Sequence, residues 1–244
     1  MWILQFLLGL VLTSLLVHVD ANTEKVVFVA PAAEPLPSDA SIDNLLLTSF
    51  SEPFPSARTY INASFPTKDS EKGTVTWFLL EQLQPGRRYE VRICWLATQP
   101  TSFWLYTHSI DHVFGDADLI TSLSGYAYAR HDHLSSEDII SLQARKPPKS
   151  TAASTTTLFL QVFAMADYYS LDTDLMEHVP PVAVDVILDP FILNVLPRSL
   201  LPTGLYLVLI VIGAWLLSGW VSKKLTARSP DGDVVFDSKK PLHD

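Results

Sequence analysis

Apolar and β-branched residues occur in short runs along most of the chain, and turn-forming residues separate these runs. Runs of this length that alternate or are rich in Val, Ile, Phe, Tyr and Trp predict β-strands. No segment of comparable length shows a clean helical period, and the best helix candidate is a short one after Ser135. The sequence predicts a mainly β fold, an antiparallel β-sandwich of the immunoglobulin or fibronectin III kind. The predicted strands are 25–31, 45–50, 57–65, 74–83, 89–97, 102–110, 156–169 and 182–193.

One turn between two of these strands has a recognisable pattern, LQPGRRYEVRICW at 83–95. Pro85 presets φ and Gly86 can take a positive φ, so the pair predicts a tight turn. Tyr89 then opens a strand in which every second residue is apolar. A tyrosine so placed can bury its ring and bond its hydroxyl to nearby backbone, which is the tyrosine corner of immunoglobulin-like and fibronectin III domains. We expect Pro85, Gly86 and Tyr89 to stabilise the fold.

The two ends of the chain carry the longest apolar runs. Residues 1–21 predict a secretory signal peptide, with an uncleaved anchor as the alternative. Residues 200–221 contain no charge and would extend about 33 Å as a helix, enough to cross the hydrocarbon core of a bilayer. Lysine residues follow this run, so the tail at 222–244 is expected in the cytoplasm. Residues 22–199 are then a lumenal or extracellular β-sandwich domain.

The composition of the chain excludes some classes of binding partner and shows how the domain can be stabilised. The formal net charge of −9 argues against nucleic acid and anionic membrane surfaces as partners. Cys94 is the single cysteine, so the domain contains no internal disulfide and must be stabilised by its own core or by a partner. Asn62, Ala63 and Ser64 form an N-glycosylation sequon within a predicted strand, where an outward Asn62 could be modified.

No motif in the chain indicates catalysis. A G-x-S-x-G elbow, a Glu-x-x-His pair and a glycine-rich phosphate loop are all missing from the sequence. His131, Asp132 and His133 could contribute to a metal site, but solvated loop residues are the simpler interpretation. Carboxylates between 167 and 174 could bind a sugar or calcium, with a solvated turn as the alternative. We expect no catalytic residue, metal or cofactor.

The segment FWLY at 103–106 places bulky side chains on both faces of one strand. One face must therefore contact something other than an ordinary core. Loops could cover it, or it could bind a partner through Phe103, Trp104 and Tyr106.

Two stretches, NTEKVVFVAP (22–31) and LQPGRRYEVRICWLATQPTSFWL (83–105), resemble the fungal co-activator subunit of glycosylphosphatidylinositol (GPI) mannosyltransferase II. The layout of signal, lumenal domain, one C-terminal span and short tail is also similar. The resemblance implies a single-pass protein of the endoplasmic reticulum membrane with its large domain in the lumen. It implies association with a separate multi-span mannosyltransferase, which carries the active site and adds the second mannose. No catalytic residue is implied for this chain.

Two classes of function follow from these observations. The first is a non-catalytic accessory subunit that stabilises or orients a membrane mannosyltransferase during GPI-anchor biosynthesis. The second is a single-span cargo receptor or adhesion-type module. Retention in the endoplasmic reticulum is expected for the first class and not for the second. A lumenal glycan-modifying enzyme is a third hypothesis.

Overall fold

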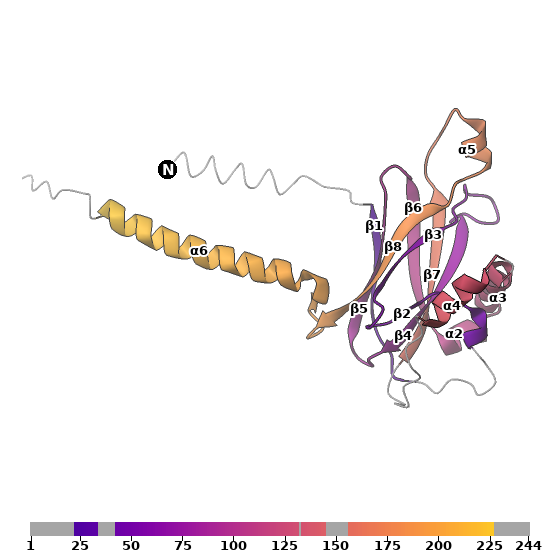
Figure 1. Ribbon diagram of the computed structural model, residues 1–244, viewed down its shortest axis with the longest axis horizontal. Helices are drawn as coiled ribbons and strands as arrows, with labels where there is room; N and C mark the ends of the chain where they lie inside the picture. Colours follow the sequence, from indigo (N-terminus) through magenta and orange to yellow (C-terminus); the bar gives the residue numbers. More distant parts are fainter. Residues whose placement is uncertain (1–21, 34–41, 132, 145–155, 227–244) are drawn as a thin grey trace, which may run out of the picture. The chain divides into compact units, whose positions relative to one another are not determined.

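The computed structural model describes residues 22–33, 42–131, 133–144 and 156–226 (Figure 1). The predicted signal at 1–21 and most of the predicted cytoplasmic tail lie outside the described residues. The strands are β1 (Thr23–Val29), β2 (Ser49–Phe50), β3 (Ser56–Ile61), β4 (Thr74–Leu83), β5 (Arg88–Trp95), β6 (Thr101–Ser109), β7 (Thr156–Ala166), β8 (Val182–Ile192) and β9 (Leu196–Pro197). The helices are η1 (Ile42–Leu45), α2 (Ile110–Gly115), α3 (Ala117–His131), α4 (Ser136–Ala144), α5 (Thr173–Glu177), η2 (Arg198–Leu200) and α6 (Leu201–Thr226).

The strands form two sheets, which confirms the mainly β prediction. Sheet A has the order β1-β5-β8-β3, with β9 paired to β8, and sheet B has the order β2-β4-β7-β6. All pairings are antiparallel except the short one between β2 and β4. Each of the eight predicted segments overlaps a strand, and the two-residue β9 is an additional one. The strand order differs from the ABED and CFG sheets of an immunoglobulin domain, so the immunoglobulin-like part of the prediction is not supported.

Apolar side chains from both sheets pack into one core between them. Tyr89, Val91 and Ile93 of β5 point into this core and are fully buried. Phe78 and Leu80 of β4 meet them from sheet B. Each large side chain buried in this way contributes about 1.5–3 kcal/mol to stability. The core thus supplies the stability that a chain without internal disulfides requires.

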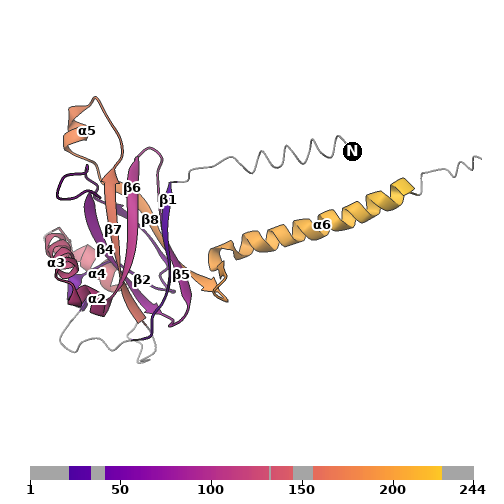
Figure 2. The same ribbon diagram turned by 180° about the vertical axis from the view of Figure 1, so that it is seen from behind.

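A second apolar cluster lies on the outer face of sheet B, beneath a helical layer. Trp77 and Phe159 of the sheet contact Val113 of α2 and Leu123 of α3 in this cluster. Figure 2 shows the same helices on the same side of the sheet from behind. The predicted helix after Ser135 is confirmed as α4, but the 15-residue helix α3 was not predicted. In α3 only Leu123 and Ala127 are buried. The spacing of apolar residues in its sequence therefore shows only a weak helical period.

The C-terminal residues from Ser199 onward form a separate unit. Its 26-residue helix α6 carries exposed apolar side chains along its length. The segment Arg198–Lys224 has a mean hydropathy of 2.2 and is long and apolar enough to cross a membrane. Near its end, Nζ of Lys224 lies 5.7 Å from the ring centroid of Trp220. A tryptophan beside a lysine is typical of the membrane–water boundary.

Candidate functional site

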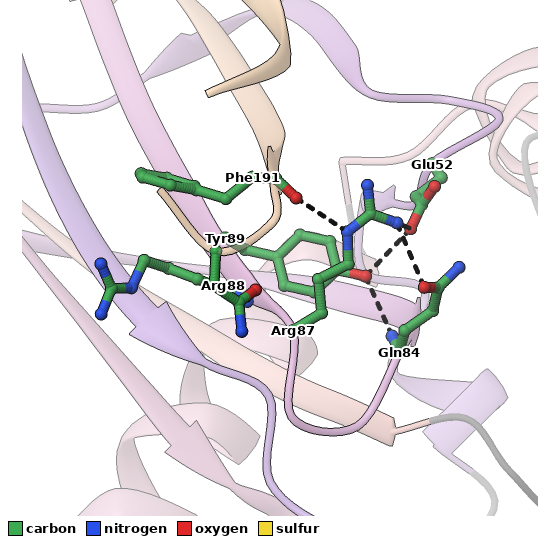
Figure 3. Close-up of polar contacts among 7 residues, drawn as sticks. Glu52, Gln84, Arg87, Arg88, Tyr89 and Phe191 are labelled. Carbon is green, nitrogen blue, oxygen red and sulfur yellow. Dashed lines mark hydrogen bonds and ion pairs between the residues drawn. The ribbon is translucent and has the colours of Figure 1, made fainter. Parts of the chain in front are cut away.

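The turn between β4 and β5 is closed by Tyr89, whose side chain is fully buried. The Tyr89 hydroxyl accepts a hydrogen bond of 2.9 Å from the backbone N–H of Gln84. It also donates one of 3.0 Å to Oε1 of Glu52 (Figure 3). Gly86 has a φ of +75°, the left-handed conformation that the turn requires. This is the geometry of a tyrosine corner, with an additional carboxylate partner that the sequence did not reveal.

Arg87 connects this corner to two other segments (Figure 3). Its Nη1 lies 2.8 Å from Oε1 of Glu52, in the loop between β2 and β3. Its Nε donates a 3.2 Å hydrogen bond to the carbonyl of Phe191, near the end of β8. Burial and the adjacent Glu52 raise the pKa of Tyr89 to about 12, so the hydroxyl remains protonated at physiological pH. The corner therefore holds three segments together.

The outer face of sheet B is covered by helices over only part of its area. The remaining part carries Trp104 and Tyr106 of β6 beside Phe163 and Met165 of β7; we call these four residues the open aromatic half. Tyr106 is 37% exposed, and the other three are partly exposed. Trp104 lies directly across from Phe163 in the β6–β7 pairing. The rings of Tyr106 and Phe163 meet edge to face at 6.1 Å.

Phe103 does not belong to this surface. Its side chain is 4% exposed and points into the core, where its ring lies 4.7 Å from that of Trp95. Neighbouring residues on a strand face opposite sides, so Phe103 shares its side with Leu105, whereas Trp104 and Tyr106 lie on the other. The sequence-based grouping of Phe103 with Trp104 and Tyr106 is corrected accordingly.

One cation lies over the open aromatic half. Nζ of Lys72 is 4.7 Å from the ring centroid of Tyr106 and 5.6 Å from that of Phe163. It also donates a 2.7 Å hydrogen bond to the Tyr106 hydroxyl. Cation–π contacts at exposed sites contribute about 0.5–1 kcal/mol, so the lysine can leave the rings at small cost.

The outer face of sheet A carries several charged pairs and also an exposed tyrosine on its edge strand β3. Glu90 is 4% exposed and pairs with Lys25 at 3.2 Å and with Arg92 at 3.5 Å. At the opposite edge, Arg58 makes a bidentate contact with Asp185, with both distances 2.8 Å. Charged residues are depleted in the cores of protein interfaces, while aromatic residues are enriched. The open aromatic half is therefore the better candidate for contact with a partner.

Asn62 is exposed and directly follows β3, which ends at Ile61. The predicted strand at 57–65 thus ends four residues earlier than expected, at Ile61. Ile61 and Ala63 on either side are buried. The amide of Asn62 thus points outward, on the same side as Tyr60.

The residues considered for metal or sugar binding have local structural roles. Asp172 caps α5 by accepting a 3.1 Å hydrogen bond from the N–H of Asp174. His131 bonds to the carbonyl of Asn44 at 3.0 Å, and its neighbour Asp132 lies outside the described residues. Within the described parts of the chain, no three His, Cys, Asp or Glu side chains are grouped so that they could hold a metal ion.

His108 lies at the boundary between the helical layer and the open aromatic half. Its Nε2 is 3.0 Å from Oε1 of Gln161, and its ring lies 5.4 Å from that of His112. Burial lowers the pKa of His108, and the neighbouring His112 adds to this effect, while Gln161 and Asp116 oppose it. The neutral imidazole is therefore favoured in the folded protein.

Comparison with known proteins identifies a family. A family model described as GPI-mannosyltransferase II co-activator (Pga1) matches residues 12–219. No curated protein and no solved structure matches the chain.

Proposed function

The chain belongs to the family of GPI-mannosyltransferase II co-activators, and from this premise we propose that it is a non-catalytic accessory subunit of the mannosyltransferase complex. In this role it supports addition of the second mannose during GPI-anchor biosynthesis. The active site belongs to the catalytic membrane subunit, which this chain binds through its β-sandwich and its apolar helix. The family match over most of the chain is the single observation that carries this proposal.

The open aromatic half is our candidate for the lumenal contact. Trp104, Tyr106 and Phe163 present aromatic area on a rigid sheet, which keeps the entropy lost on binding small. Lys72 covers these rings through a flexible side chain and can be displaced by a partner. The helices cover the rest of this face, so the partner would meet a bounded patch instead of a whole sheet.

For the membrane, we propose a type I orientation in the endoplasmic reticulum. The GPI pathway of the family implies that compartment. Lys223 and Lys224 follow the apolar part of α6, which favours a cytoplasmic C-terminus. Residues 1–21 would direct the domain into the lumen and be removed.

Co-activation would act through mass action. A subunit that binds only the folded form of the catalytic protein raises its apparent stability, by about 2.7 kcal/mol when the free subunit is present at a hundred times its Kd. Loss of the co-activator should then lower the amount of folded catalytic subunit as well as its activity.

Depletion of this chain in its own cells tests the proposal. We expect GPI precursors with a single mannose to accumulate, and the catalytic subunit to decrease while its transcript is unchanged. Re-expression of the full chain should restore both. Normal precursors after depletion would contradict the accessory role and favour the cargo receptor or adhesion module.

A further inference from the structure

We propose that Asn62 carries an N-linked glycan and that the first N-acetylglucosamine of this glycan packs on the exposed ring of Tyr60. The inference rests on the lumenal placement given in the proposed function. A sugar on Asn62 would explain why Tyr60, which lies outside the open aromatic half, is an exposed aromatic residue.

The local backbone presents Asn62 to an enzyme. Asn62-Ala63-Ser64 is the one Asn-x-Ser/Thr sequence with x other than Pro in the whole chain. Asn62 is exposed and lies just beyond β3, where the pairing of Ile61 with Val182 ends the ladder. Val182 is the first residue of β8, so Asn62 lies about 33 Å along the sheet from the far end of β8. The acceptor is thus at the opposite end of the sandwich from β9 and the chain exit.

Transfer of the glycan requires a polyprenyl diphosphate-linked oligosaccharide as donor. The Asn62 amide nitrogen forms a bond to C1 of the reducing-end sugar, and the bond from C1 to the diphosphate oxygen breaks. The lipid diphosphate leaves with the bonding electrons, and the amide proton passes to a base of the transferring enzyme. No oxidation or reduction occurs.

Tyr60 is placed to contact the attached sugar. It precedes Asn62 by two residues, and because both are exposed while the residues between and after them are buried, both side chains lie on the outer side of sheet A. Their Cα atoms are about 6.6 Å apart in extended chain, a separation that one pyranose ring can bridge. The Tyr60 side chain is 72% exposed, and among the described residues it stacks on no other aromatic ring.

The surface beside Tyr60 leaves room for a sugar. The cross-strand neighbour of Tyr60 is the small Ala183. A shallow hollow of about 290 Å³ lies here, lined by Tyr60, Ala183, Trp95, Leu96 and four other residues. The C–H groups on one face of N-acetylglucosamine are apolar and suit the negative face of an aromatic ring. Because β3 is one of the two edge strands of sheet A, a glycan here would also shield a free strand edge from pairing with other chains.

Electrophoretic mobility before and after deglycosylation tests whether Asn62 is modified in the full chain expressed in eukaryotic cells. The wild type and Ser64→Thr keep the sequon and should each shift by one glycan on treatment with peptide N-glycosidase F. Ser64→Ala should not shift. Leu171→Asn in the Ser64→Ala background creates an Asn-Asp-Thr sequon at a side chain that is 90% exposed, and it reports lumenal exposure independently.

The two arms distinguish the inference from the proposed topology. An unmodified wild type together with a modified Leu171→Asn variant would overturn the glycan at Asn62 and leave the lumenal placement intact. If neither protein were modified, both the glycan and the lumenal placement would be contradicted.

Selective trimming tests the contact with Tyr60. Endoglycosidase H leaves one N-acetylglucosamine on Asn62, whereas peptide N-glycosidase F hydrolyses the side-chain amide, removes the whole glycan and leaves an aspartate in every variant compared. In detergent, we expect the trimmed wild type to melt about 2 °C above the fully deglycosylated wild type. The difference is small because one contact between a sugar and an aromatic ring contributes little free energy. Tyr60→Phe should keep this difference and Tyr60→Ser should abolish it. An equal difference in Tyr60→Ser, or none in the wild type, would overturn the packing of the sugar on Tyr60.

Discussion

The hydroxyl of Tyr89 donates a 3.0 Å hydrogen bond to Oε1 of Glu52, a residue 37 positions earlier in the chain. Because the same hydroxyl accepts the N–H of Gln84, one buried oxygen joins the β4–β5 turn to the loop between β2 and β3. The carboxylate of Glu52 is in turn held by Arg87. The corner is therefore a junction of distant segments as well as a local turn.

Removal of the hydroxyl in Tyr89→Phe should lower the free energy of unfolding by about 1–2 kcal/mol. The change leaves the ring in place but deprives Glu52 and the Gln84 N–H of a partner. Thermal unfolding of the purified full chain in detergent measures the effect. Tyr128→Phe is the matched control because Tyr128 is 76% exposed, and it should melt like the wild type. Equal melting temperatures for the two variants would contradict a stabilising role of the Tyr89 hydroxyl.

Two glycines with similar backbone conformations should respond differently to alanine. Gly73 has φ +74° and Gly86 has φ +75°, so both substitutions introduce backbone strain. At Gly73 the new Cβ would also overlap the carbonyl oxygen of Ala164, whereas at Gly86 it meets open space. We expect Gly73→Ala to destabilise by about 3 kcal/mol and Gly86→Ala by about 1 kcal/mol. Similar unfolding temperatures for the two variants would contradict the close approach of Gly73 to β7.

Mild acid should destabilise the domain through His108. The folded state lowers the pKa of His108, so protonation is easier in the unfolded chain. This contribution to stability is complete above the unfolded pKa of about 6.5 and is lost as the pH falls through the lower folded pKa. His108→Gln should therefore show a shallower loss of melting temperature between pH 7.5 and pH 5.

The wild type measured over the same pH range provides the comparison. Parallel slopes for the wild type and His108→Gln would show that burial of His108 does not contribute to the pH dependence.

The strands could be predicted because side-chain alternation is a local property of the sequence. Their order could not, since pairing depends on contacts between distant residues, such as Arg58 of β3 with Asp185 of β8. The long helix α3 was missed because few of its apolar residues are buried, which leaves no clear helical period in its sequence. Tertiary packing on Trp77 and Phe159 stabilises it instead.

The candidate site was predicted only in part. The pattern at Pro85, Gly86 and Tyr89 identifies the turn, but the contribution of Glu52 depends on a loop whose position is not encoded locally. The FWLY segment indicates rings on two faces without saying which face is the core. The structure shows that Phe103 is inside and Trp104 outside, because Phe103 packs on Trp95 of the opposite sheet.

The most direct test is recovery of the catalytic mannosyltransferase on the full chain in a gentle detergent. We expect the wild type to retain it, and Trp104→Ser/Tyr106→Ser to retain at least about tenfold less, as expected when interface anchors worth over 1.4 kcal/mol are lost. Tyr128→Ser, an exposed tyrosine on α3, should retain it fully, and melting temperatures should show that all variants are folded. Recovery of no mannosyltransferase by the wild type, or equal recovery by the double variant, would contradict the account.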